Sequence, residues 1–285
     1  MSILVSPQEL KESIYHGDRF TLLGTHWQPK TGQSFIDFAS QHIPTALFGD
    51  TGAAFVGLPG SRNGRNPLPD EDKLQAWIRS WGLQEDRPVV VYDEGRGLFA
   101  GRAWWTVRWA GLTDVRILDG GLENWLAHGY QTLTGPGNIA VGSTFEVTPG
   151  QLQTASIDDV RKHDGVLIDT RSSNRFAGRR ENLDLKAGHI PGAVNIPERL
   201  FHNDGVRTLK SPDEIREVLA AAGLTQENTK DAIIYSGSGN HSALALAAME
   251  DAGFTGLRHY IGGWSQWSAD PTNPVERGDR TSVND

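Results

Sequence analysis

The two halves of this chain share one ordered pattern, and this repeat limits the available folds more than any other feature. Residues 89–125 and residues 232–267 each contain an apolar strand ending in Tyr, a Gly-containing loop, a helix, a short strand and a Gly-Gly pair. The spacing from the Gly that ends the helix to the Gly-Gly pair is the same in both halves. A repeat of about 140 residues indicates a duplicated domain, because solenoid repeats are far shorter.

Local patterns within each half predict alternating helices and strands. Apolar residues recur at i, i+3, i+4 and i+7 over residues 74–81 and again over residues 215–222, which indicates an amphipathic helix in each half. Residues 211–214 carry a capping-box pattern with Pro at the first helical position. We therefore expect an α/β fold with two tandem domains, each a mainly parallel sheet flanked by helices.

The boundary between the halves shows in the composition. Residues 133–153 are rich in Gly, Pro, Ser and Thr, which is typical of a linker. We therefore expect a first domain over residues 1–132 and a second over residues 154–285. A chain of 285 residues is long enough for two ordinary domains.

Charge and composition exclude several classes of protein. The net charge of −8 and the pI near 5.6 disfavour nucleic-acid binding, which uses basic faces. The apolar run at residues 243–249 is far shorter than the ~20 residues that span a bilayer. The N-terminus has no basic stretch followed by an apolar one, so we expect no signal peptide. These features predict a cytoplasmic monomer that does not bind membranes.

The second Tyr-ended strand leads into a loop suited to present one side chain to several backbone N–H groups. The sequence IIYSGSGNH at residues 233–241 reads as a strand, a glycine turn and a helix start, with Ser236 as the presented residue. Glycines let consecutive N–H groups converge on one point, which forms a nest for an anion. Ser236 could therefore be a nucleophile, part of an anion site, or the remnant of an active site whose reactive atom is missing.

Several further stretches, in order along the chain, resemble the two-domain rhodanese family of thiosulfate and 3-mercaptopyruvate sulfurtransferases. They read LIDTR at 167–171, RFAG at 175–178, GHIPGAVNIP at 188–197 and GGWSQW at 262–267. The segments WW at 104–105 and GGLENW at 120–125 fit the first domain of that family. The resemblance covers nearly the whole chain and implies two tandem rhodanese-like domains.

The resemblance implies that residues 236–241 are the active-site loop, although its nucleophile differs. The mercaptopyruvate branch of the family has the sequence CGSGVT there. The matching residues are Gly237, Ser238 and Gly239, and the replacements are Ser236 for Cys, Asn240 for Val and His241 for Thr. Asp93 holds the position of Ser236 in the first half, which fits a non-catalytic first domain.

The reaction implied by the resemblance requires a sulfur atom at position 236. In that family a Cys thiolate takes the outer sulfur of a small anionic donor, holds it as a persulfide and passes it to cyanide or a thiol, without a cofactor. This chain contains no Cys. A hydroxyl is not ionised near neutral pH unless a base activates it, and its attack on sulfur would give an S–O bond. We therefore predict little or no sulfurtransferase turnover.

A serine-hydrolase role for Ser236 is disfavoured by the sequence around it. The pattern Gly-x-Ser-x-Gly is absent, because Ile234 and Ser238 occupy the flanking positions. His241 is a candidate base only if it folds back toward the loop. We interpret His241 as a residue that shapes the pocket, with a direct contact to the anion as the alternative.

The cationic residues that would hold the donor are only partly present. Arg175 matches the substrate-contacting Arg of the family's RFxG segment. The family's second Arg has no counterpart, because Asp184 lies at that offset. Arg179 or Arg180 is the candidate replacement, and Arg180 is the one we place in the predicted site.

Other residues of the resembling segments are interpreted as supports. Asp169 and Arg171 are expected to form an ion pair that anchors the loop, and His189 is expected to bind turn carbonyls through its ring. The resemblance places Trp264 beside the cleft. The nine His residues show no H-E-x-x-H spacing, so we expect no metal site.

Two hypotheses of different classes remain. The first is a sulfurtransferase of the rhodanese family whose Cys has been replaced, naturally or by engineering. The second is a non-catalytic rhodanese homologue that binds an anion or a partner through the retained loop. Both fit a chain without Cys.

Overall fold

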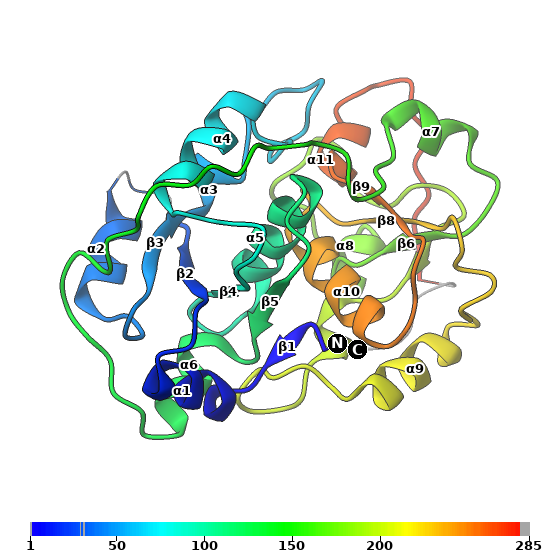
Figure 1. Ribbon diagram of the computed structural model, residues 1–285. Helices are drawn as coiled ribbons and strands as arrows, with labels where there is room; N and C mark the ends of the chain where they lie inside the picture. The colour runs from blue at the N-terminus through cyan, green and yellow to red at the C-terminus, as the bar shows by residue number, and fades with distance from the viewer. Residues whose placement is uncertain (1, 29, 31, 280–285) are drawn as a thin grey trace. The chain divides into compact units, whose positions relative to one another are not determined.

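The computed structural model describes residues 2–28, 30 and 32–279, and the chain divides into two compact units. The first unit is formed by the residues up to Gly57, by Pro69–Gln151 and by Asp204–Leu209. The second is formed by Leu58–Leu68, by Leu152–Asn203 and by the residues from Lys210 onward. Each unit contains one parallel sheet with its own helices (Figure 1). The predicted α/β class with parallel sheets flanked by helices is confirmed.

The sheet of the first unit has the order β1-β5-β4-β2-β3, with every neighbouring pair parallel. Its strands are β1 (Leu4–Val5), β2 (Thr21–His26), β3 (Leu47–Asp50), β4 (Val89–Tyr92) and β5 (Val115–Leu118). Its helices are α1 (Pro7–His16), α2 (Gln33–Ser40), α3 (Thr51–Ala54), α4 (Glu71–Ser80), α5 (Leu98–Trp109) and α6 (Gly121–Ala127). Every residue of β2 and β4 is buried, as expected for parallel strands covered on both faces.

The sheet of the second unit has the order β7-β6-β8-β9 and is also parallel. Its strands are β6 (Leu167–Asp169), β7 (Val194–Asn195), β8 (Ile233–Tyr235) and β9 (Arg258–Tyr260). Its helices are α7 (Ile157–Lys162), α8 (Ser173–Phe176), the 3-10 helix η1 (Glu198–Phe201), α9 (Pro212–Ala221), α10 (Asn240–Asp251) and α11 (Gly263–Trp267). Strand β8 is fully buried and leads into the loop that begins at Ser236.

The helix-start signals in the sequence correspond to real caps. Ser211 accepts the backbone N–H of Glu214, and the Glu214 carboxylate accepts the N–H of Ser211 at 2.9 Å. Such a capping box satisfies two N–H groups that the helix itself leaves without acceptors. Helices α4 and α9 form where the apolar spacing predicted them. Among the described residues, none of the helices has the length and apolar character that crossing a bilayer requires.

One buried His has the same contacts in each unit. Nδ1 of His189 donates to the carbonyl oxygen of Phe176 at 2.8 Å, and Nδ1 of His42 donates to that of Phe38 at 3.0 Å. The ring of His189 also stacks on that of Phe176, and the ring of His42 on that of Phe38, with interplanar angles of 8° and 9°. Burial lowers the pKa of His189, which favours the neutral ring that this packing needs. His189 therefore stabilises a turn.

The Tyr that ends the central strand also has the same partner in both units. The hydroxyl of Tyr235 accepts the backbone N–H of Ile190 at 3.3 Å, and that of Tyr92 accepts the N–H of Ile43 at 3.2 Å. Both Tyr side chains are fully buried. This bond ties the strand before the loop to the His-Ile-Pro segment.

The units differ from the continuous domains that the composition of the chain predicted. Leu58–Leu68 belongs with the second unit, where the N–H of Arg65 donates to Oγ of Ser265 at 3.0 Å. Asp204–Leu209 belongs with the first, where the N–H of Leu209 donates to a carboxylate oxygen of Asp119 at 2.8 Å. Most of the expected linker, up to Gln151, also belongs with the first unit.

Replacing Tyr235 with Phe should destabilise the second unit, because the buried N–H of Ile190 loses its acceptor. We expect Tyr235→Phe to lower the free energy of unfolding by about 1–2 kcal/mol, as measured by urea denaturation. The matched substitution Tyr92→Phe should cause a similar loss in the first unit. Unchanged stability in both variants would show that these hydroxyls do not anchor the strands.

Candidate active site

The loop after β8 is held in place by the start of α11. The carbonyl oxygens of Ser236 and Gly237 accept the N–H groups of Trp264 and Ser265 at 2.8 and 2.9 Å. Gly263 has a φ of +55°, and a Cβ added there would lie 2.3 Å from the carbonyl oxygen of Ser236. Only glycine allows this close approach, which explains one of the two glycines of the Gly-Gly pair.

The first unit builds the same loop after β4. The carbonyl oxygens of Asp93 and Glu94 accept the N–H groups of Leu122 and Glu123 at 2.9 and 3.0 Å. Gly121 also has a φ of +55°, and a Cβ there would lie 2.4 Å from the carbonyl oxygen of Asp93. The two loops therefore share the same pair of backbone hydrogen bonds to the helix that follows the Gly-Gly pair, although the first loop is one residue longer.

The side chain of Asp93 fills the anion site of the first loop. Its carboxylate is buried and accepts backbone N–H groups at 2.9–3.4 Å from Gly95, Gly97, Phe99 and Ala100. These groups lie at the start of α5, where the helix dipole favours negative charge. The Asp93 carboxylate thus takes the N–H groups that would otherwise be donors to an external anion.

The loop of the second unit leaves the corresponding site unfilled by its own side chain. Oγ of Ser236 accepts the N–H of Gly239 at 3.0 Å. Within the described part of the chain, the N–H groups of Ser238, Asn240 and His241 have no hydrogen-bond acceptor. Gly239 has a φ of +89°, which turns the loop into the first turn of α10. The second loop therefore differs from the first in having backbone N–H groups without an acceptor among the described residues.

Ser236 contacts a buried chain of hydroxyl and imidazole groups. Its Oγ lies 3.1 Å from Oγ of Ser242, which lies 2.7 Å from Nε2 of His259. All three residues are fully buried. Among the described residues, Ser236 therefore has no direct hydrogen bond to a His, in contrast to the arrangement of a serine hydrolase.

The side chain of His241 contacts Glu198. Its Nδ1 donates to the Glu198 carboxylate at 3.0 Å, and Nε2 of His202 contacts the other carboxylate oxygen. Burial alone would raise the pKa of Glu198, but the hydrogen bonds from His202 and His241 outweigh it and lower that pKa to about 2. His241 thus links the first turn of α10 to η1. The predicted role of shaping the pocket fits this position.

Two guanidinium groups lie against the loop. A Cβ added at Gly237 would lie 3.1 Å from Nη1 of Arg175 and 3.1 Å from Nη2 of Arg65. Arg175 was predicted from its RFxG segment, whereas Arg65 lies in Leu58–Leu68 and was not predicted. The neighbouring Asn66 donates to Oγ of Ser238 at 2.7 Å.

For Arg179 and Arg180, the two candidate replacements, no contact with residues 236–241 is found among the described residues. The side chain of Arg180 is exposed, and its backbone N–H donates to the carbonyl oxygen of Asn174. Arg179 forms an exposed ion pair with Asp279 at 2.9 Å. The cation that accompanies Arg175 at Gly237 is therefore Arg65.

Beneath the loop lies a buried ion pair. Nε and Nη2 of Arg171 both donate to the carboxylate of Asp169, and Nη2 also donates to the carbonyl oxygen of Gly188. Its guanidinium lies 4.6 Å from the centre of the Trp264 ring, and the indole N–H donates to Lys186. Burial alone would lower the pKa of Arg171, but the Asp169 charge raises it. Trp264 is fully buried and joins the Arg171 guanidinium to the loop, where its backbone N–H donates to the carbonyl oxygen of Ser236.

One polar group near the loop has no protein partner. The side-chain oxygen of Asn240 is buried and accepts no hydrogen bond among the described residues. The described residues also contain no group of three His, Asp or Glu side chains that could hold a metal ion. The arrangement is thus a set of N–H donors and guanidinium groups around a hydroxyl, which suits an anion.

Replacing Glu198 with Gln should reduce stability in a pH-dependent manner. Because the folded pKa of Glu198 lies below its ordinary value of 4.5, its charge stabilises the fold above that pH, and the contribution is lost as the pH falls toward 2. We expect Glu198→Gln to lower the free energy of unfolding by about 1–3 kcal/mol at neutral pH. Urea denaturation at several pH values should show that the difference in free energy of unfolding between the unaltered chain and the variant becomes smaller below pH 4.5. A gap independent of pH would contradict this role.

Comparison with known proteins identifies the family. The Rhodanese-like domain matches residues 27–128 and 150–270. A Mycobacterium tuberculosis protein named "Putative thiosulfate sulfurtransferase SseB" is 34% identical over 281 residues, covering 97% of each chain. A Pseudomonas aeruginosa protein named "Probable 3-mercaptopyruvate sulfurtransferase" is 36% identical over 251 residues, covering 85% of this chain and 86% of the relative.

A solved structure has the same fold. SseA from Escherichia coli, described as a 3-mercaptopyruvate sulfotransferase with the rhodanese fold, superposes with a TM-score of 0.79 at 25% identity. The superposition covers 93% of this chain and 100% of that one. With two matched regions and the same loop built twice, this chain belongs to the rhodanese family and contains two rhodanese-like domains.

Proposed function

We propose that the loop at residues 236–241 binds the oxyanion of a small sulfur donor, and that the chain transfers little or no sulfur because Ser236 replaces the nucleophilic Cys. The observation that carries this proposal is the contrast between the two loops. Asp93 occupies the first anion site, whereas the second loop has N–H groups without acceptors around a hydroxyl. An intact receptor site without its reactive atom accounts for both features.

The donor class follows from the relatives and from the charge of the site. The relatives are named for thiosulfate and for 3-mercaptopyruvate, which are both small anions. Arg65 and Arg175 beside Gly237 supply N–H donors suited to a sulfonate or carboxylate. A thiol or cyanide would be the acceptor in a chain that carries Cys at position 236. A monomeric state and a cytoplasmic location stay as predictions.

The missing step is the storage of sulfur. A sulfurtransferase of this family breaks the S–S or C–S bond of its donor as the thiolate attacks the outer sulfur, and the departing anion takes the electron pair. The family's Cys, at the position that corresponds to 236, then holds a persulfide. Ser236 reaches the buried His259 only through Ser242, so activation of its hydroxyl would need two coupled proton transfers. Even then, oxygen would not form the S–S bond.

A second candidate function is non-catalytic binding of an anion or a partner. The observation in its favour is the environment of α10 at its first turn, where His241 donates a hydrogen bond to Glu198, and where the side-chain oxygen of Asn240 has no partner among the described residues. These groups replace the apolar side chain and the hydroxyl of the related loops. Their presence favours a site adapted to binding if Cys alone fails to restore transfer.

Replacing Ser236 with Cys separates the two functions. We expect Ser236→Cys to raise turnover of thiosulfate or 3-mercaptopyruvate by at least about a hundredfold, because a thiolate in this loop is both ionised and able to hold sulfur. Mass spectrometry should detect a persulfide in the Cys variant alone. Restored turnover supports the first function, and continued inactivity favours the second. Ordinary enzymatic turnover by the unaltered chain would contradict the proposal.

Replacing Ser236 with Asp should close the second anion site in the way Asp93 closes the first. We expect Ser236→Asp to abolish sulfate binding in isothermal titration and to increase the free energy of unfolding by about 0.5–2 kcal/mol, because a carboxylate at a helix start is favourable. Ser236→Asn is the uncharged control of similar size. Undiminished sulfate binding in the Asp variant would place the anion site elsewhere.

A further inference from the structure

Two arginines and two carboxylates form a compact charged cluster beside the loop. Resting on the proposed function, we infer that Arg65 and Arg175 together bind the oxyanion of the donor, and that Asp184 keeps this site at low affinity by neutralising them. The inference makes the two arginines act as a pair and assigns a role to Asp184.

In each arginine, one guanidinium nitrogen contacts the carboxylates of the cluster and another lies next to the loop. Nη2 of Arg175 donates to Asp184 at 2.8 Å and to Glu181 at 2.9 Å, while Nη1 of Arg65 pairs with the other oxygen of Asp184. Nη1 of Arg175 and Nη2 of Arg65 are the nitrogens nearest to Gly237. These two nitrogens are therefore placed to donate to a ligand held by the loop.

The cluster carries no net charge when all four groups are ionised. The side chains of Asp184 and Glu181 are only 3% and 4% exposed, whereas those of Arg65 and Arg175 are 32% and 20% exposed. Burial lowers the pKa of Arg65, and the nearby charge of Arg175 lowers it further. Two guanidinium groups thus repel each other here, and the carboxylates between them offset that repulsion. An anion bound at the loop therefore contacts N–H donors, but the net electrostatic attraction of the cluster for it is weak.

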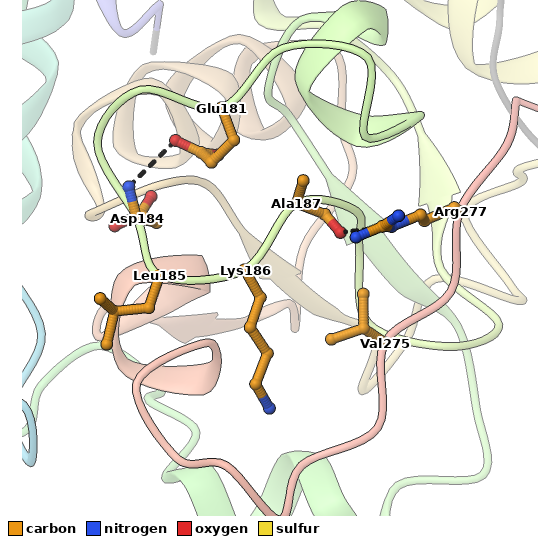
Figure 2. A pocket seen from close by; sticks show the side chains of 7 residues that line it. All are labelled: Glu181, Asp184, Leu185, Lys186, Ala187, Val275 and Arg277. Atoms are coloured by element: carbon orange, nitrogen blue, oxygen red, sulfur yellow. Dashed lines mark hydrogen bonds between the residues drawn. The ribbon is translucent and has the colours of Figure 1, made fainter.

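Glu181 and Asp184 have different roles in the cluster. Glu181 also accepts the backbone N–H groups of Leu183 and Asp184, at 2.9 and 3.1 Å, so it holds the segment together. Asp184 contacts both guanidinium groups. Residues Glu181 and Asp184–Ala187 line part of a pocket of about 740 Å³. Figure 2 shows the Glu181 carboxylate turned toward the backbone of Asp184. The pocket is lined by no residue of 236–241, so it is not the donor site.

The test measures sulfate binding by isothermal titration. Because Asp184→Asn removes one negative charge close to the ligand while keeping the shape of the side chain, we expect about tenfold tighter binding than in the unaltered chain. The gain should diminish at high salt, since ions screen the uncovered positive charge. Arg65→Gln should weaken sulfate binding by about tenfold, because it removes one of the two charged donors.

The control is Asp279→Asn, which makes the same change in net charge at an exposed pair with Arg179. We expect its sulfate affinity to stay within about twofold of the unaltered chain. Equal affinities for the unaltered chain, Asp184→Asn and Arg65→Gln would overturn this inference while leaving the anion site in place. Arg65→Gln decides the matter by itself if Asp184→Asn does not fold. Absence of sulfate binding in every variant would instead contradict the proposed function.

Discussion

Backbone N–H groups at the start of a helix need acceptors, and the two loops of this chain meet that need differently. In the first, the carboxylate of Asp93 accepts the N–H groups of the loop and of the first turn of α5. In the second, Ser236 accepts one N–H, and those of Ser238, Asn240 and His241 have no acceptor among the described residues. In the function proposed above, this difference separates a structural loop from an anion-binding loop.

The rest of each unit keeps its loop rigid. A Tyr hydroxyl ties the preceding strand to the His-Ile-Pro segment, and a Gly-Gly pair lets the following helix bond to the loop carbonyls. These contacts recur in both units, although only one loop is open. The scaffold thus sets where the N–H groups point, and the side chain at position 93 or 236 determines how many of them find an acceptor within the loop.

Local patterns predicted the elements that depend on neighbouring residues. The Tyr-ended strands, the loops, the caps of α9 and the parallel α/β class all followed from spacing and composition. The contact of Arg65 with the loop did not, because Leu58–Leu68 is far from Gly237 in sequence and has no periodic pattern. Asp184 was a signal in the sequence that a further cation lies nearby. It stands at the position where the family has an Arg, and a buried carboxylate needs a cation beside it.

The central claim is that the second loop, unlike the first, has N–H groups free to bind an anion. An amide NMR spectrum recorded during titration of the unaltered protein with sulfate tests it most directly, because each loop reports on itself. We expect the signals of Ser238, Asn240 and His241 to shift, and those of Gly95 and Gly97 to stay in place. If the signals of the second loop do not move, or if both loops respond equally, the claim is contradicted.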